Sequence, residues 1–129
     1  MREILFRGKT YEGEWKEGGL ISSLNGKRFY IGNMYQVEEV DPETVGQYTG
    51  LTDNNGKKIF EGDIISCHSF TGINDFKKSL VGWCDILLCF RADKHSLYGD
   101  FQQDYEIIGN IHDNPELLKE GADLSLIHI

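Results

Sequence analysis

The sequence predicts a mainly β protein with a small barrel, a strand-rich N-terminal section and one short C-terminal helix. Three observations support this fold class. Short apolar runs typical of strands recur along the chain, two Asn-Gly turns separate some of them, and the 129 residues include 15 glycines but only two prolines. We therefore expect an N-terminal β section over residues 1–44, and the barrel with its short helix over residues 45–129.

The barrel is predicted from the stretch between residues 45 and 65. Residues 45–51 are rich in β-branched and aromatic side chains, as half-buried strands are. Asn55-Gly56 then tolerates the positive φ that a type I′ turn needs, so residues 57–65 are expected to return as a second strand. Gly62 interrupts that strand, and such a glycine indicates the kind of bend that turns a corner in an SH3-like barrel.

The N-terminal section reads as short strands in sequence. They are predicted at residues 3–7, 14–16, 27–31 and 34–40. Asn25-Gly26 provides the second Asn-Gly turn, between the second and third of these strands.

The second half alternates apolar runs with polar connections. Residues 81–90 are almost continuously apolar, which predicts one central buried strand between exposed loops at 68–80 and 91–104. Residues 105–111 form the last strand, and residues 114–121 carry the cap, proline and terminal glycine of a short helix. The side chains expected in the core are Ile64, Trp83, Ile86, Leu88, Ile107 and Ile111.

Composition disfavours several functions. The net charge of −8 provides no general attraction to phosphate backbones, so direct nucleic-acid binding is not expected. No apolar run reaches the roughly 18–20 residues of a membrane span, and no signal peptide is recognised, so a cytoplasmic protein is expected.

The three cysteines are interpreted as buried free thiols. An odd number argues against a disulfide framework, and Cys84 and Cys89, five apart on one strand, would face opposite sides. Neither a metal nor another cofactor is expected at these residues or at Cys67.

Catalytic motifs are missing from the sequence, so an enzyme is not expected and a small hydrolase is the least favoured class. Glu61 and Asp63 are interpreted as solvated flanks of a turn rather than as an acid–base pair. His112 and Asp113 form the other candidate pair, and a hydrogen-bonded corner is favoured there over a metal or base role.

Five residues are candidates for binding. Trp15 lies among charged residues and could be an exposed anchor or part of the core. Lys77, Lys78, Arg91 and Lys94 lie in or beside the two long predicted loops. They would give a basic edge suited to an acidic partner surface, although solvated lysines explain the pattern equally well.

Several segments together resemble the YopX family of small phage and prophage proteins. The matching segments, in order, are residues 2–8, 13–15, 44–51, Asp53, Gly56, 61–65, 108–111 and 114–118. The resemblance spans residues 2–118 and implies a mainly β protein whose later part is SH3-like. It implies no activity and no catalytic residues.

These observations favour a non-catalytic module that binds an unknown host or phage protein. An acidic mimic of nucleic acid, which would antagonise a DNA-binding protein, is the alternative, because acids cluster in residues 31–56 and 95–129. The apolar tail of residues 124–129 predicts a homo-oligomer.

Overall fold

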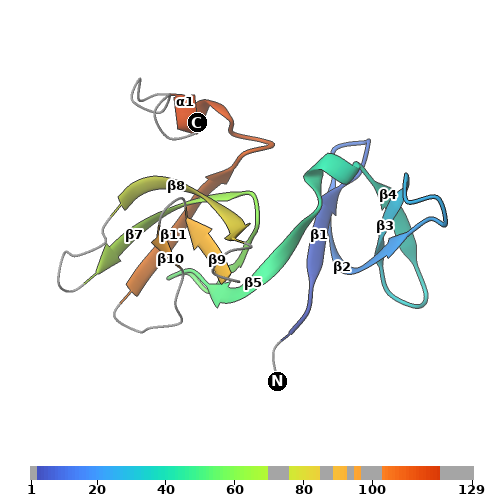
Figure 1. The fold of residues 1–129 in the computed structure, drawn as a ribbon, viewed down its shortest axis with the longest axis horizontal. Helices are drawn as coiled ribbons and strands as arrows, with labels where there is room; N and C mark the ends of the chain where they lie inside the picture. Colours follow the sequence, from blue (N-terminus) through green and yellow to red (C-terminus); the bar gives the residue numbers. More distant parts are fainter. Residues whose placement is uncertain (1–2, 70–75, 85–88, 93–94, 97–102, 120–129) are drawn as a thin grey trace. The chain divides into compact units, whose positions relative to one another are not determined.

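The computed structural model describes residues 3–69, 76–84, 89–92, 95–96 and 103–119. These residues contain eleven strands, one 3₁₀ helix and one short α-helix, so the mainly β prediction and the C-terminal helix are confirmed. The chain separates into two compact units, Met1–Gly50 and Leu51–Ile129 (Figure 1).

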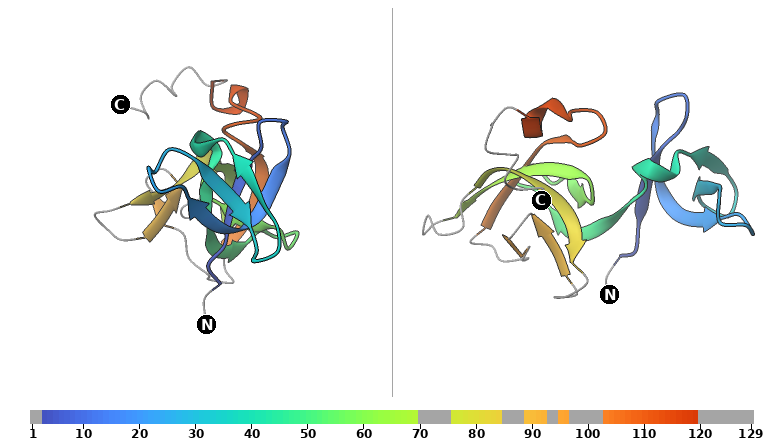
Figure 2. Two further views of the ribbon diagram at one scale, coloured as in Figure 1. Left: turned by 90° about the vertical axis from the view of Figure 1, so that its right-hand side faces the viewer. Right: turned by 45° about the horizontal axis from the view of Figure 1, so that its top comes forward.

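The first unit is a series of antiparallel hairpins. The second, third and fourth strands each pair with the strand before, and the blue strands in Figure 2 are strongly curved. The elements are β1 (Phe6–Lys9), β2 (Trp15–Ser22), β3 (Phe29–Gly32), β4 (Val37–Val40), the 3₁₀ helix η1 (Pro42–Thr44) and β5 (Gly46–Thr52). β5 pairs with β1 and continues into the second unit, where β6 (Lys58–Phe60) completes a sheet of order β4-β3-β2-β1-β5-β6.

One face of this curved sheet forms the core of the first unit. Ile31 and Val40 are buried on it. The Asp41 amide donates to the Lys9 carbonyl at 2.8 Å, and the Lys9 amide donates to Thr44 Oγ1 at 2.8 Å. The end of β4 and η1 are thereby attached to β1, which encloses the small apolar interior.

The second unit contains a five-stranded antiparallel sheet of order β10-β9-β8-β7-β11. Its elements are β7 (Asp63–Ser69), β8 (Phe76–Cys84), β9 (Cys89–Ala92), β10 (His95–Ser96), β11 (Gln103–Asn110) and α1 (Glu116–Lys119). Ile59, Ile65, Val81, Ala92 and Tyr105 form the centre of the core, together with Cys67.

The predicted SH3-like barrel is not observed among the described strands. One sheet ends in β4 and β6, and the other ends in β10 and β11, so the pairing closes neither of them. β10 has two residues and β6 has three, which leaves these edges too short for the continuous ladder that a closed barrel needs.

The apolar run of residues 81–90 forms a hairpin, so the prediction of one continuous strand is wrong. β8 pairs with β9 in a register that sets Cys84 opposite Cys89. The argument that these cysteines face opposite sides of one strand therefore does not apply. Two adjacent half-buried strands can produce the same apolar run as a single fully buried strand.

The predicted core is confirmed in part. Ile64 is buried, whereas Ile107 and Ile111 are half-buried. Trp83 is 44% exposed and packs edge-on against Phe90, with ring centroids 4.9 Å apart, so its predicted burial is wrong. Ile86 and Leu88 lie outside the described residues.

Both long predicted loops are shorter than expected. Residues 68–69 extend β7 and residues 76–80 belong to β8. Residues 91–92, 95–96 and 103–104 are also in strands, while the remaining parts of both predicted loops lie outside the described residues. In the first unit, residues 34–36 form a turn and not the start of a strand.

Asp63 is buried, so its interpretation as a solvated turn flank is wrong. Its carboxylate accepts a hydrogen bond from the Phe60 amide at 2.8 Å. The side chain therefore stabilises the bend between β6 and β7 from inside the unit.

Candidate functional site

Trp15 is half-buried on the first unit, and its ring is covered by cations of the neighbouring strand. The Arg7 guanidinium lies 4.7 Å from the ring centroid, and the Lys9 ammonium lies 5.8 Å from it. β1 and β2 pair Lys9 with Trp15, which brings these groups together. A cation–π arrangement of this kind stabilises the sheet, while the role of Trp15 in binding stays a prediction.

The predicted basic edge is not assembled on loops. Lys77 and Lys78 lie in β8, where a register shift against β7 interrupts the ladder. Arg91 is half-buried in β9, opposite Gly82 of β8. Lys94 lies outside the described residues. The binding role of these four residues stays a prediction.

The three most exposed large apolar side chains described in the first unit lie at the ends of its hairpins. Met34 and Tyr35 in the β3–β4 turn (residues 33–36) are 86% and 89% exposed. Leu24 in the β2–β3 turn is also fully exposed, and Tyr11 is exposed in the β1–β2 connection. Scattered exposed apolar residues are normal, but two adjacent ones at a turn form a contiguous apolar surface.

The β3–β4 turn holds Met34 and Tyr35 outward through its own hydrogen bonds. Asn33 Oδ1 accepts from the Tyr35 amide at 2.8 Å and from the Gln36 amide at 3.0 Å. The Asn33 amide donates to the Gln36 carbonyl at 3.0 Å. An Asx turn of this kind fixes the backbone beneath the two exposed side chains. Because the backbone at Met34 and Tyr35 is already fixed, a partner that binds these side chains loses little binding free energy to backbone ordering.

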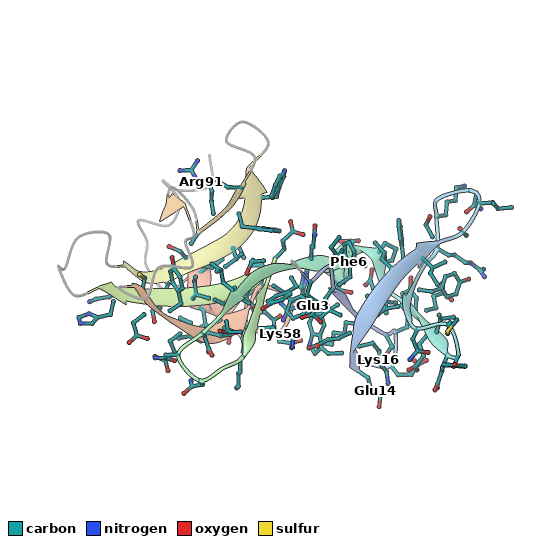
Figure 3. All side chains as sticks on the ribbon, turned by 90° about the horizontal axis from the view of Figure 1, so that it is seen from below. Glu3, Phe6, Glu14, Lys16, Lys58 and Arg91 are labelled. Carbon is teal, nitrogen blue, oxygen red and sulfur yellow. The ribbon has the colours of Figure 1, made fainter. Side chains whose placement is uncertain are left out.

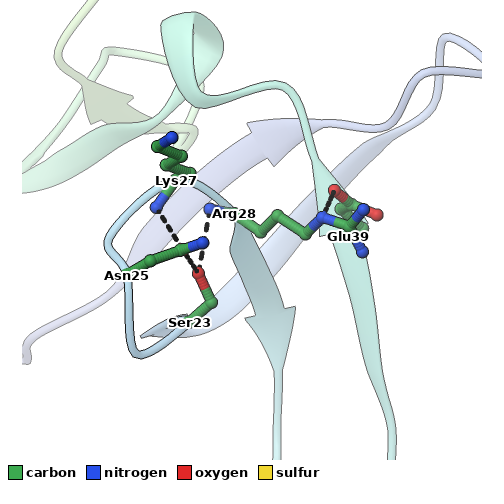
Figure 4. Close-up of polar contacts among 5 residues, drawn as sticks. All are labelled: Ser23, Asn25, Lys27, Arg28 and Glu39. Atoms are coloured by element: carbon green, nitrogen blue, oxygen red, sulfur yellow. Dashed lines mark hydrogen bonds and ion pairs between the residues drawn. The ribbon is translucent and has the colours of Figure 1, made fainter.

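The β2–β3 turn is built in the same way (Figure 4). Ser23 Oγ donates to Asn25 Oδ1 at 2.6 Å, and Asn25 Oδ1 also accepts from the Lys27 amide at 3.0 Å. Ser23 Oγ accepts from the Arg28 amide at 3.1 Å. This network holds Leu24 in solvent at the end of the hairpin.

A row of apolar side chains on the sheet lies between the two turns. The register sets Ile21 opposite Tyr30, and Gly32 opposite Val37. Side chains two apart on a strand share a face, so Ile21, Tyr30 and Val37 lie together on the face opposite the core. We call Ile21, Leu24, Tyr30, Met34, Tyr35 and Val37 the apolar surface.

Charged pairs lie on both faces of this sheet, because the register sets Glu38 opposite Ile31 on the core face and Glu39 opposite Tyr30 of the apolar surface. Lys16 Nζ lies 2.9 Å from Glu38 Oε2 and 3.6 Å from Glu14 Oε1 (Figure 3). The hydrogen bond with Glu38 raises the pKa of Lys16 above its ordinary value. Arg28 Nε lies 4.0 Å from Glu39 Oε2, at the outer limit of an ion pair (Figure 4).

Buried carboxylates in the second unit accept hydrogen bonds from the main chain. Asp53 accepts from the amides of Asn55, Lys57 and Ile107, at 2.9, 2.8 and 3.2 Å. Burial of Asp53 would raise its pKa, but these hydrogen bonds stabilise the carboxylate and lower the pKa below the ordinary value. The carboxylate therefore joins the turn after β5 to β11.

The corner at residues 110–114 is hydrogen-bonded, as the favoured interpretation predicted. Asn110 Oδ1 accepts from the amides of His112 and Asp113 at 3.0 and 2.8 Å. Asn110 Nδ2 donates to Asp113 Oδ2 at 3.2 Å. These hydrogen bonds fix the backbone of the corner that contains His112 and Asp113.

Within the described ranges, no helix is long and apolar enough to cross a membrane. Among the same residues, no three His, Cys, Asp or Glu side chains are grouped as metal ligands would be.

Comparison with known proteins identifies the family. The model of the YopX protein family matches residues 20–119. The chain belongs to the YopX family. The matched part of this YopX protein begins in β2 and ends with α1, so it includes the apolar surface.

A solved structure resembles this YopX protein along most of its length. The crystal structure of protein EF1440 from Enterococcus faecalis aligns with a TM-score of 0.54 and 26% identity. The alignment covers 91% of this chain and 99% of that one. No curated protein matches the sequence.

Sequence reasoning missed Met34, Tyr35 and Leu24. The sequence predicts one strand over residues 34–40, and a strand residue such as Met34 has no special exposure. The available signal was the apolar pair directly after Asn33, because asparagine favours turns and turns expose their central side chains.

Proposed function

We propose that this YopX-family protein is a non-catalytic module, encoded by a phage or prophage, that binds a host or phage protein in the cytoplasm. The observation that carries the proposal is the apolar surface, whose two turns are fixed by internal hydrogen bonds. Contiguous exposed apolar surface of this kind is characteristic of protein-interaction sites.

The chemistry of the surface suits protein recognition. Tyr35 and Met34 combine large apolar area with few polar atoms, and both types are enriched at interfaces. The Arg28–Glu39 pair lies on the same face as Tyr30 and would form part of a polar rim around this surface. Because hydrogen bonds already fix the two turns, less conformational entropy is lost on binding.

The acids of residues 31–56 support this proposal over nucleic-acid mimicry. A mimic needs a stripe of exposed carboxylates with the spacing of phosphates. Here Glu38 and Glu39 lie beside Lys16 and Arg28, and Asp53 is buried and bonded to the main chain. This mixed arrangement favours recognition of a protein surface.

The proposal is tested by affinity capture from lysate of the host, followed by mass spectrometry. The wild-type protein is compared with a Met34→Ser/Tyr35→Ser double variant. An Ile4→Ser/Tyr11→Ser variant is the matched control. Like the test variant, it replaces one flexible apolar side chain and one tyrosine by serine, and both of these side chains are exposed elsewhere in the first unit.

We expect a partner that the wild type and the control both capture and that the Met34→Ser/Tyr35→Ser variant loses. Circular dichroism must show that all three proteins keep the same β structure. Capture of identical partners by all three proteins would contradict the proposal.

A further inference from the structure

β4 is the outermost strand of its sheet, and its outer edge has no neighbouring strand among the described residues. The direction of its main-chain groups follows from the ladder with β3. The Asn33 amide donates to the Gln36 carbonyl, so this pair is of the hydrogen-bonded type. Alternation along an antiparallel ladder then makes Gly32–Val37 and Tyr30–Glu39 non-hydrogen-bonded pairs.

The amide and carbonyl groups of Val37 and Glu39 therefore point away from β3. One observation agrees with this assignment. Asp41, two residues beyond Glu39, directs its amide away from β3 and donates to the Lys9 carbonyl of β1.

The β4 edge can thus accept an added strand over Val37 and Glu39, with about four main-chain hydrogen bonds. Val37 is 43% exposed, so a strand can approach its side. The exposed pair Met34 and Tyr35 precedes β4 directly and would contact the side chains of the added strand.

Charge decides which strand fits this edge. Residues 31–52 contain four acids and no lysine or arginine. A second copy of β4 would set these glutamates against one another, and like charges opposite each other are destabilising. A segment with lysine or arginine at alternate positions would instead complement Glu39, whose contact with Arg28 is long at 4.0 Å.

We propose that the β4 edge binds an extended basic segment of the partner protein by strand addition, with Met34 and Tyr35 contacting its apolar side chains. This inference rests on the proposed function and names the recognition mode and the chemistry of the partner. Two copies of the chain are not expected to pair through this edge.

The probe is an eight-residue peptide, blocked at both ends, in which lysine alternates with valine and threonine. Its titration is followed by the exchange rates of the protein's backbone amides. We expect exchange at Val37 and Glu39 to slow at least about tenfold on saturation. The amides of Glu38 and Val40 face β3 and are expected to change little. A peptide with glutamate in place of lysine should not bind.

Two further measurements distinguish binding by strand addition from nonspecific electrostatic binding of the peptide. Methylation of alternate peptide nitrogens on the paired edge removes main-chain donors and keeps every charge, so it should abolish binding. Glu39→Lys should lower the affinity for the lysine peptide about tenfold. Glu43→Lys is the control, because Glu43 is exposed and lies outside β4, and it should change that affinity less than about twofold.

Equal binding of the methylated peptide, or unchanged exchange at Val37 and Glu39, would overturn strand addition. If capture still depends on Met34 and Tyr35 in that case, the proposed function stands without this recognition mode. Protection of Val37 and Glu39 by the peptide, with no partner that depends on Met34 and Tyr35, would count against the proposed function alone.

Discussion

Asp53 connects the turn after β5 to β11 through three main-chain hydrogen bonds. Because its folded-state pKa is lowered, its contribution to stability is fully present above the ordinary value of 3.8. That contribution is lost as the pH falls through the lower folded-state pKa. The structure therefore makes this carboxylate one source of acid sensitivity.

Replacement of Asp53 by asparagine tests this role. We expect the variant to be less stable than wild type at pH 7 by about 1–3 kcal/mol, because one main-chain donor loses its charged acceptor. The difference should shrink when both are measured below the folded-state pKa. Urea unfolding at several pH values checks this, with Asp104→Asn, exposed on β11, as the control. An equal loss at every pH would contradict the role of the charge.

Single residues also show what sequence reasoning could reach. Gly26 and Gly56 both adopt positive φ in turns between strands, as the two Asn-Gly pairs predict. The burial of Asp63 could not be predicted, because its acceptor role depends on how the bend orients the Phe60 amide. The exposure of Met34 depends similarly on a local Asx turn.

At the scale of elements, β11 contains an irregularity that accommodates the C-terminal helix. Its register against β7 shifts between Ile107 and Gly109. A Cβ on Gly109 would lie 2.7 Å from both Asn114 Oδ1 and Leu117 Cδ1. The helix packs closely over this position because glycine has no side chain.

We expect Gly109→Ala to destabilise the protein by about 1–3 kcal/mol, since the segment around Asn114 must shift to admit a methyl group. Gly82→Ala in β8 is the control, because a Cβ there meets nothing within 4 Å and the change should stay within about 0.5 kcal/mol. Urea unfolding measures both. Equal stability of the two variants would contradict the close packing of the helix.

The hairpin of β8 and β9 marks the limit of prediction for elements. Val81 of β8 and Phe90 of β9 are both buried, so the apolar run continues through a reversal of the chain. Periodicity detects burial but not the direction of the chain. The order of strands in each sheet depends on pairing between distant residues, so local sequence patterns do not predict it.

For the whole molecule, a homo-oligomer remains a prediction. Its basis is the apolar tail, Leu124, Leu126, Ile127 and Ile129, which lies outside the described residues. Light scattering should give a multiple of the 14.7 kDa chain mass, and removal of residues 124–129 should reduce it to one chain. A mass of 14.7 kDa for the intact protein at high concentration would reject the prediction. The predicted boundary between residues 44 and 45 likewise stays a prediction.

The family match and the structural likeness to EF1440 concern the fold and leave the partner open. We propose that the protein binds its partner through the apolar surface. Trp83, an exposed aromatic side chain described in the second unit, is not expected to take part in this contact.

Hydroxyl-radical footprinting of the captured complex tests whether the partner covers the apolar surface, because Met, Tyr and Trp side chains all react readily with the radical. Met34 and Tyr35 are exposed in the free protein, and Trp83 is partly exposed, so all three report on contact. We predict that the partner lowers oxidation of Met34 and Tyr35 several-fold and leaves Trp83 unchanged. Protection of Trp83, with Met34 and Tyr35 oxidised as in the free protein, would contradict the claim.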